Sequence, residues 1–125
     1  MTWGIVGSRS FQDWDRFVVE LDRLMTGQVV DRIVSGGADG ADSLAERFAL
    51  ERGIPLTVHQ ADWERYRSKA GPKRNRLIVR DSDVIVAFWV GVSTGTKNTI
   101  RRAREAGKTV HIISIPEPGD SHENL

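Results

Sequence analysis

The sequence predicts an α/β fold, Rossmann-like, with an open parallel five-stranded sheet flanked by helices on both faces. Short apolar and β-branched runs alternate along the chain with segments whose apolar residues recur at helical spacing. Five strands that alternate with four helices are expected to pair in parallel, through right-handed crossovers. The run DVIVAFW, residues 83–89, is continuously apolar after its first residue and predicts a central strand buried on both faces.

Two strand-helix units open the chain. Residues 3–8 (WGIVGS) predict the first strand, and residues 13–25 place apolar side chains at helical spacing. Residues 29–35 (VVDRIVS) are rich in β-branched residues and predict the second strand. Residues 41–52 repeat the helical pattern, which a following glycine and proline end.

The alternation continues through the second half of the chain. Residues 56–60 predict a short third strand, and residues 61–71 form a long polar connection. A helix is expected over residues 72–80, because proline is well tolerated in a first helical turn. After the central strand, residues 96–106 predict the last helix and residues 110–115 the fifth strand.

Length and composition limit the class of protein. The 125 residues have the size of one domain, expected over residues 1–115, with a flexible tail over residues 116–125. The chain has no cysteine, which excludes disulfides and thiolate metal sites, and its three histidines lack the spacing of zinc ligands. No apolar run approaches the roughly 20 residues of a membrane span, and no signal peptide is recognisable. We therefore expect a cytoplasmic protein without a membrane partner.

Three loops are expected to lie together. In an open parallel sheet, ligands bind beyond the carboxyl ends of the strands, where the strand order reverses. The loops that leave the first, second and fourth predicted strands are GSRSF (7–11), SGGADGAD (35–42) and WVGVSTGTKN (89–98). These are the candidate ligand-binding loops.

The first loop offers Gly7, Ser8 and Arg9 at the end of a buried strand. The guanidinium of Arg9 can hold a phosphate or carboxylate in a bidentate contact. The alternative is a surface arginine that pairs with Asp13 or Asp15. The dinucleotide motif G-x-G-x-x-G is absent, which argues against an ordinary NAD-binding domain.

The second loop combines three glycines with two aspartates. Glycine amides can approach a ligand closely or adopt positive φ, and the following helix directs its positive N-terminus toward the same place. The aspartates repel phosphate, so they are better suited to ribose hydroxyls, to Mg²⁺, or to capping the helix at Asp39. No cofactor is required. The candidate ligand-binding residues here are Ser35, Gly36, Gly37, Asp39, Gly40 and Asp42.

The third loop is the strongest predicted phosphate site. It follows the central strand and contains two glycines, three hydroxyls and a lysine, so amides, helix dipole and ammonium converge on one anion. A P-loop needs glycine in place of Thr96 and serine or threonine in place of Asn98, so triphosphate hydrolysis has no support. The alternative is a helix capped by a hydroxyl, with a solvated lysine. The candidate ligand-binding residues are Gly91, Ser93, Thr94, Gly95, Thr96 and Lys97.

Charge is distributed unevenly along the chain. Residues 1–64 hold six lysines and arginines against eleven acids, whereas residues 65–108 hold twelve against three. This asymmetry indicates an anionic partner for the middle of the chain, or solvated helix faces whose charge the first half balances in the fold.

Residues 65–80, here called the basic segment, contain seven lysines and arginines and no acid. Trp63 lies just before this segment and Tyr66 within it. Basic and aromatic side chains in alternation can bind a nucleic-acid backbone and its bases, or a single nucleotide. Trp63 and Trp89 are interpreted first as packing residues.

Five motifs taken together, GSRSF, SGGADGAD, ADWERY, AGPKRN and FWVGVSTGT, resemble the YspA-like (cpYpsA-related) branch of the SLOG superfamily. They follow in order from about Gly4 to Ile113. The resemblance implies a Rossmann-like domain that binds nucleotides or nucleotide-derived ligands. Many relatives in this branch are inferred to be sensors in bacterial and phage conflict systems. More distant members are the LOG phosphoribohydrolases, which cleave the base from nucleoside monophosphates, and DprA, which binds single-stranded DNA. A homodimer is implied by the resemblance alone.

The resemblance to LOG enzymes is incomplete at the catalytic residues. Arg74, with Asn75 beside it, aligns with the catalytic arginine, but Thr99 stands where P-G-G-x-G-T-x-x-E places the catalytic glutamate. Cleavage of an N-glycosidic bond needs a carboxylate to stabilise the sugar cation or to activate water, and threonine does neither well. The candidates to replace that carboxylate are Asp39, Asp42 and Asp62.

The leading hypothesis is a domain that binds a nucleoside monophosphate or an ADP-ribose-like ligand, as a sensor or sequestering protein. The predicted phosphate anchors are the amides of residues 95–97 with Arg9 or Arg74, and the predicted sugar contacts are Asp39 and Asp42. The second hypothesis is hydrolysis of a nucleotide N-glycosidic bond by Arg74 and an aspartate. The third is single-stranded nucleic-acid binding through the basic segment.

Overall fold

The computed structural model describes residues 1–116 and confirms the predicted Rossmann-like α/β fold. All five strands pair in parallel, in the order β3-β2-β1-β4-β5. The strands are β1 (Thr2–Gly7), β2 (Arg32–Ser35), β3 (Leu56–Val58), β4 (Val84–Val90) and β5 (Thr109–Ile115). The helices are α1 (Trp14–Met25), α2 (Ala41–Arg52), α3 (Trp63–Tyr66), α4 (Ala70–Asp81) and α5 (Thr94–Glu105), and a 3₁₀ turn, η1 (Arg67–Lys69), joins α3 to α4. Residues 117–125 of the predicted tail lie outside the described residues.

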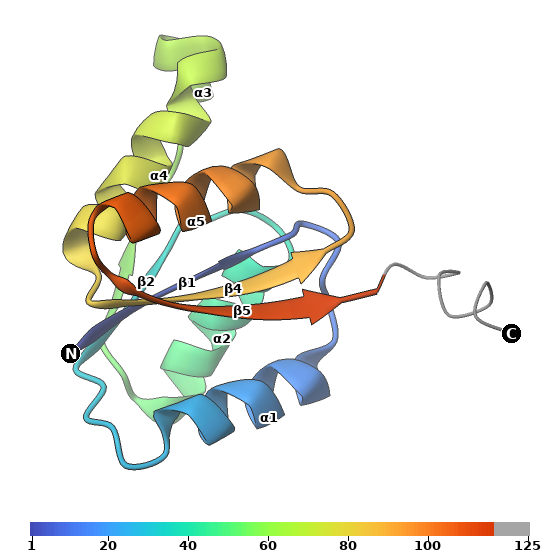
Figure 1. The fold of residues 1–125 in the computed structure, drawn as a ribbon, viewed down its shortest axis with the longest axis vertical. Helices are drawn as coiled ribbons and strands as arrows, with labels where there is room; N and C mark the ends of the chain where they lie inside the picture. The colour runs from blue at the N-terminus through green and yellow to red at the C-terminus, as the bar shows by residue number, and fades with distance from the viewer. Residues whose placement is uncertain (117–125) are drawn as a thin grey trace, which may run out of the picture.

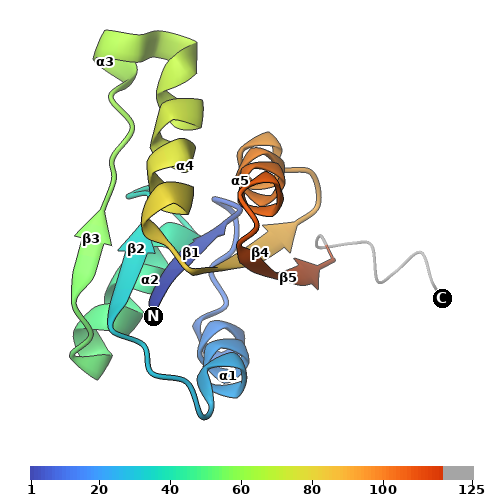
Figure 2. The same cartoon turned by 60° about the vertical axis from the view of Figure 1, so that its left-hand side comes forward.

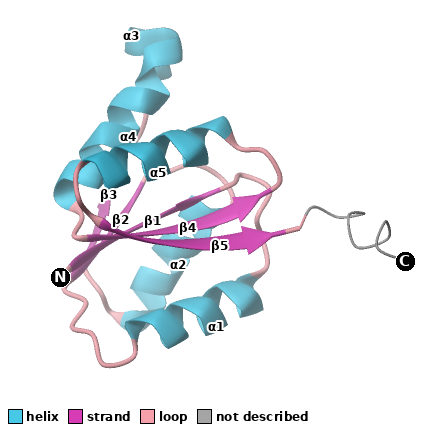
Figure 3. Cartoon of the chain, viewed as in Figure 1, coloured by secondary structure: helices cyan, strands magenta, loops and turns pink. Residues whose placement is uncertain are grey.

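The helices form two layers around the sheet. Helices α1 and α2 cover one face, and α4 and α5 cover the other (Figures 1 and 3). The side view shows α3 beyond the carboxyl end of β3, at the far end of α4 from the sheet (Figure 2). No helix in the described part of the chain is long and apolar enough to cross a membrane.

Strand β4 is buried on both faces, as its sequence predicts. Val84, Val86 and Phe88 join the apolar cluster under α1 and α2. Ile85 and Ala87 point the other way, into the cluster under α4 and α5. This alternation divides the core into two apolar layers separated by the sheet.

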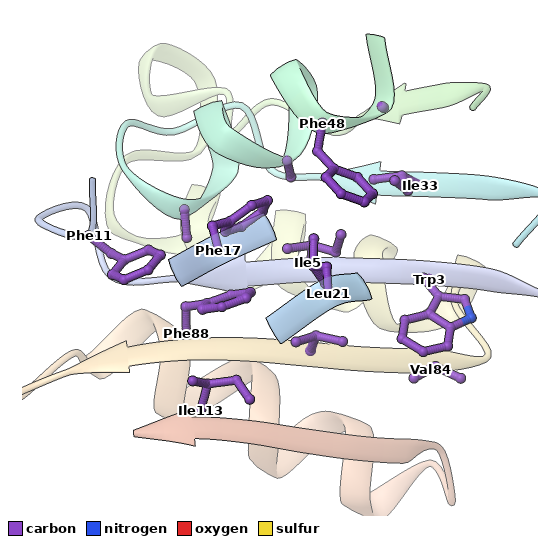
Figure 4. Packing of buried hydrophobic residues seen from close by; sticks show 14 of the residues in the cluster. Trp3, Ile5, Phe11, Phe17, Leu21, Ile33, Phe48, Val84, Phe88 and Ile113 are labelled. Atoms are coloured by element: carbon purple, nitrogen blue, oxygen red, sulfur yellow. The ribbon is translucent and has the colours of Figure 1, made fainter. Parts of the chain in front are cut away.

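Aromatic rings fill the larger of the two clusters (Figure 4). The ring of Phe17 from α1 stacks on Phe88 of β4 with centroids 4.7 Å apart, and Phe11 stacks on Phe88 at 5.1 Å. Phe48 of α2 meets Phe17 edge to face. These contacts hold the β1–α1 loop, which carries Phe11, against the end of β4.

Three predicted segments around the second and third strands differ from the observed elements. Residues 29–31 lie before β2, which begins at Arg32. The Asp31 amide donates a hydrogen bond to the carbonyl of Met1 at 2.9 Å, just before the paired part of the two strands. The predicted connection over residues 61–71 contains α3, which Asp62 caps by accepting a hydrogen bond from the amide of Arg65 at 3.1 Å. Helix α4 begins at Ala70, so Pro72 is its third residue.

The strand order reverses between β1 and β4. The chain passes outward from β1 through β2 to β3 and then returns to place β4 on the other side of β1. Ser8 joins the ends of these two strands, since its hydroxyl donates to the carbonyl of Val90 at 3.2 Å and accepts from the amide of Val90 at 2.9 Å. The loops that follow β1 and β4 therefore start side by side.

Candidate functional site

A cavity of about 720 Å³ lies where the strand order reverses. The loop after β1 and the loop after β4 line two of its sides, and the first half of α4 forms a wall. The loop after β2 contributes only Ala38 and Asp42. The three loops that the sequence analysis selected thus meet at one cavity, although the second loop reaches it at only two residues.

The predicted site residues divide between the cavity and its surroundings. Those that line the cavity are Gly7, Ser8, Arg9, Asp42, Arg74, Asn75, Ser93, Thr94, Gly95 and Thr96. Those that do not line it are Ser35, Gly36, Gly37, Asp39, Gly40, Gly91 and Lys97. Lining residues absent from the predicted set include Ser10, Trp63, Ser68, Gly71, Pro72, Asn98 and Thr99. Several of these belong to the motifs ADWERY and AGPKRN, which were considered mainly for their charge.

Arg9 presents an unengaged guanidinium to the cavity. Its side chain is exposed, and it forms no hydrogen bond or ion pair with another described residue. The alternative pairing with Asp13 or Asp15 is wrong, because Asp13 instead accepts the amide of Arg16 at 3.1 Å as the cap of α1. Arg9 is thus a free cation at the rim.

The glycines of the second loop give clearance to the protein's own chain. A Cβ atom at Gly36 would lie 2.8 Å from the Asp42 carboxylate and 2.9 Å from the Arg74 guanidinium. A Cβ atom at Gly40 would collide with the carbonyl oxygens of Ser8 and Arg9, and Gly40 has a φ of 74°. At both positions the missing side chain makes room for the protein's own atoms, and close approach of these glycines to a ligand stays a prediction.

Asp42 is a buried carboxylate beside two guanidinium groups. Burial raises its pKa from 3.8 to about 6, while the hydrogen bond from the Ala38 amide and the charges of Arg74 and Arg9 act in the opposite direction. Its Oδ2 atom accepts that amide at 3.1 Å. Asp42 lines the cavity, and the pKa of its carboxyl group is close to neutral pH, at about 6.

Asp39 lies outside this arrangement. It is exposed and does not line the cavity. The prediction that it caps the second helix is also wrong, because Gly40 occupies the N-cap position of α2 and no side chain supplies the capping hydrogen bond. Of the two aspartates, only Asp42 lines the cavity.

Arg74 and Asn75 connect the second loop to the start of α5. The Nη1 atom of Arg74 donates to the carbonyl of Gly36 at 2.8 Å, and its Nε donates to the Asn75 Oδ1 at 2.9 Å. Asn75 donates in turn to the carbonyl of Gly95 at 3.3 Å and to Asn98 at 3.2 Å. Burial lowers the pKa of Arg74, which stays protonated at neutral pH. The network fixes a half-buried cation in the wall of the cavity.

The first turn of α5 leaves two amides without partners. Ser93 caps the helix, accepting the amide of Thr96 on its hydroxyl at 3.4 Å and that of Lys97 on its carbonyl at 3.0 Å. The amides of Thr94 and Gly95 have no hydrogen-bond partner among the described residues. A Cβ atom at Gly95 would meet nothing within 4 Å, so the cavity is open there. An anion would therefore meet Thr94 and Gly95.

Lys97 is not among the residues that line the cavity. Its side chain is exposed outside the cavity lining, and its amide is already bonded within the helix. The prediction that the amides of residues 95–97 are all open to a phosphate is wrong, since only that of Gly95 remains free. The available amides lie one residue earlier, at Thr94 and Gly95.

The carboxylates offered as replacements for a catalytic glutamate occupy different places. Thr99 is buried, and its hydroxyl donates to the carbonyl of Gly95 at 3.1 Å. Asp62 is exposed, caps α3 and does not line the cavity. Among the described residues, Asp42 is the one carboxylate in the lining. No group of three or more histidine, aspartate or glutamate side chains in residues 1–116 is placed to hold a metal ion.

Four of the seven cations in the basic segment have contacts within the protein. Arg65 and Lys73 lie over the Tyr66 ring, at 5.0 and 4.5 Å from its centroid. Arg80 pairs with Asp81 at 2.8 Å, and Arg74 is held in the wall of the cavity. The cations without such contacts in the described structure are Arg67, Lys69 and Arg76.

Sequence and structure comparisons place the chain among known proteins. The model of the YspA, cpYpsA-related SLOG family matches residues 5–66. The Gene 61 protein of Mycobacterium phage D29 is 43% identical over 113 residues, covering 82% of this chain and 88% of the relative.

Two solved structures share the fold. DNA processing protein A from Helicobacter pylori, solved in a study of its single-stranded DNA binding mode, superposes with a TM-score of 0.67 at 20% identity over 90% of this chain. DNA processing protein A (DprA) from Streptococcus pneumoniae gives a TM-score of 0.53 at 16% identity over 87% of this chain. The chain spans 64% and 57% of these two proteins, respectively.

Proposed function

The chain belongs to the YspA, cpYpsA-related SLOG family, and on this premise we propose that it binds a nucleotide or a nucleotide-derived ligand in the cavity between β1 and β4. The ligand is a nucleoside monophosphate or an ADP-ribose-like molecule. One observation carries the proposal: Thr94 and Gly95, whose amides are free, line the same cavity as Arg9, Arg74 and the buried Asp42. The cavity volume of about 720 Å³ lies in the usual range for small-molecule sites.

The phosphate lies at the start of α5 in this proposal. The amides of Thr94 and Gly95 donate to it, and the positive end of the helix favours its charge. Arg9 supplies an exposed guanidinium from the opposite loop, and Arg74 supplies one from α4 that is held by hydrogen bonds. The positive charge of these two guanidinium groups favours an anionic ligand.

The sugar lies toward Asp42. An ionised carboxylate accepts hydrogen bonds from hydroxyl groups, and the Asp42 carboxylate is ionised above its pKa of about 6. A ribose bound between Asp42 and the phosphate site gives this buried carboxylate a function. Without the carboxylate, the neighbouring cations would attract a second phosphate. The protein then acts as a sensor or a sequestering protein.

The proposal is tested by titrating nucleotides into three matched proteins. Isothermal titration calorimetry with AMP, GMP, CMP, UMP and ADP-ribose is performed on the wild type, Arg9→Ala and Lys97→Ala. Arg9 lines the cavity and Lys97 does not, although both are exposed cations near α5 or its neighbouring loop. We expect Arg9→Ala to weaken binding roughly ten- to hundred-fold, the value of a charge-assisted hydrogen bond, and Lys97→Ala to leave it unchanged. Equal losses in both variants, or no binding by the wild type, contradict the proposal.

A second candidate is hydrolysis of a nucleotide N-glycosidic bond, which the position of Asp42 favours. A carboxylate with a pKa of about 6 can take a proton from water near neutral pH. Water then adds to the anomeric carbon as the bond to the base breaks, Asp42 holds the proton taken from water, and the departing base takes up a proton from solvent, to which Asp42 returns its own. Chromatography of nucleoside monophosphates after incubation tests this reaction. Released base that is lost in Asp42→Asn supports it, and no release above the level of that variant refutes it.

A third candidate is single-stranded nucleic acid, which the position of α3 and η1 beyond the sheet favours (Figure 2). The Helicobacter pylori structure was solved to describe single-stranded DNA binding, and it shares this fold. Arg67, Lys69 and Arg76 have no aromatic, carboxylate or carbonyl contact in the described structure, so they are the first candidates to contact phosphates. Fluorescence anisotropy with an oligonucleotide tests the candidate, because affinity must fall steeply with salt. Weak binding with a flat salt dependence refutes it.

A further inference from the structure

We infer that Trp63 is the surface on which the base of the bound nucleotide stacks. This inference rests on the proposed function and adds to it the residue that recognises the base. Trp63 was interpreted as a packing residue from the sequence, but its side chain is 48% exposed and lines the cavity. A large apolar ring left open to a polar cavity has an unused binding surface.

The contrast with neighbouring aromatic residues supports this role. Tyr66, on the same short helix, lies beneath Arg65 and Lys73 and does not line the cavity. Trp89 packs against the apolar cluster under α4 and α5. Trp63 has neither an aromatic nor a cationic partner among the described residues.

Helix α4 supports the Trp63 ring at a defined place. A Cβ atom at Gly71 would lie 3.2 Å from the Trp63 Cη2 atom, so the end of the indole rests on the first turn of α4. The Arg67 amide donates to the carbonyl of Trp63, which closes α3 on this side. A glycine at position 71 therefore lets the indole lie against the helix.

The Trp63 ring and Arg74 lie against or on the first half of α4 and line the same cavity. Gly71, which supports the indole, and Arg74 are three residues apart, which is roughly 4.5 Å along a helix axis. Both residues line the cavity. A base stacked on Trp63 then leaves its sugar and phosphate to pass Arg74 and reach the amides of Thr94 and Gly95.

Stacking sets the class of base that is preferred. Every base has a π face that an indole can bind, so recognition by Trp63 does not depend on base-edge hydrogen bonds. A purine overlaps the indole over a larger area than a pyrimidine does. We expect AMP and GMP to bind more tightly than CMP and UMP.

The experiment separates the base from the sugar phosphate. Calorimetry with AMP and with ribose 5-phosphate is performed on the wild type, Trp63→Ala, Trp63→Phe and Tyr66→Ala. Trp63→Ala should weaken AMP binding roughly 5- to 150-fold and leave ribose 5-phosphate binding unchanged. Trp63→Phe should recover most of the AMP affinity. Tyr66→Ala is the matched control, because it removes an aromatic ring from the same helix outside the cavity.

The possible results distinguish failure of the stacking inference from failure of the proposed function. Unchanged AMP affinity in Trp63→Ala, or an equal loss for ribose 5-phosphate, overturns the stacking inference while leaving nucleotide binding intact. An equal loss in Tyr66→Ala overturns it as well, since the effect then belongs to the integrity of α3. A wild-type protein that binds neither AMP nor any other nucleotide in the panel overturns the proposed function itself.

Discussion

Replacing Asp42 by asparagine is expected to stabilise the protein in a way that depends on pH. The Asp42 side chain is buried and only 6% of the residue is exposed, so its charge is poorly solvated in the folded state. Asparagine keeps an oxygen that can accept the hydrogen bond from the Ala38 amide at 3.1 Å. The substitution therefore removes the buried charge and retains the local contact.

The size and sign of the effect follow from the pKa of the carboxyl group. Folding raises that pKa from 3.8 to about 6, so the folded state holds the proton more tightly than the unfolded state. The stability that this proton provides is present below the unfolded pKa and is lost as pH rises through about 6. A shift of roughly two units corresponds to about 3 kcal/mol in total, of which about 2 kcal/mol is lost between about pH 4 and about pH 7.5.

The assay is urea unfolding of the wild type and Asp42→Asn over this pH range. Other groups titrate in both proteins, so the difference between their free energies of unfolding isolates position 42. We expect the advantage of the asparagine variant to grow by about 2 kcal/mol from about pH 4 to about pH 7.5. Parallel profiles, or a variant that loses stability as pH rises, refute the reasoning that Asp42 is a buried carboxylate with a raised pKa.

Three further substitutions test individual contacts. Gly40→Ala should lower the free energy of unfolding by about 2 to 5 kcal/mol in urea. The added Cβ collides with two backbone oxygens, and the backbone there has a φ of 74°. A smaller loss contradicts the close approach. Gly95→Ala should raise stability by about 0.5 to 1 kcal/mol, since it removes a helical glycine beside open space, yet weaken nucleotide binding roughly tenfold in calorimetry. Unchanged affinity would move the phosphate away from α5. Arg67→Gly should raise stability by about 1 kcal/mol in thermal unfolding, because Arg67 has a φ of 51° and a ψ of −129°, and a loss of stability would contradict this strain.

The parts of the fold that local sequence controls could be predicted. The continuous apolar run of β4 indicated burial on both faces, and the boundaries of α2 follow from its apolar spacing and its terminal glycine. The starts of the helices were less accurate where a side chain decides them. Ser93 caps α5 and Asp62 caps α3, and both caps depend on backbone geometry that a sequence pattern does not give.

The candidate site was predictable in location but not in the use of each residue. The rule that ligands bind where strand order reverses led to the loops after β1 and β4. The sequence predicts close approach of the second-loop glycines to a ligand, but it gives no sign that Arg74 packs against Gly36 or that the Ser8 carbonyl lies against Gly40. It also predicts a packing role for Trp63, because the exposure of this residue depends on how α3 folds against α4.

Titration of ¹⁵N-labelled protein with AMP, followed by amide chemical shifts, tests directly whether a nucleotide occupies the cavity between the loops after β1 and β4. A nucleotide in this cavity should give saturable shifts for Arg9, Thr94 and Gly95 and leave the amides of α1, on the opposite face of the sheet, unchanged. Shifts confined to other parts of the molecule, or no saturable shift with AMP or any nucleotide of the panel, would contradict it.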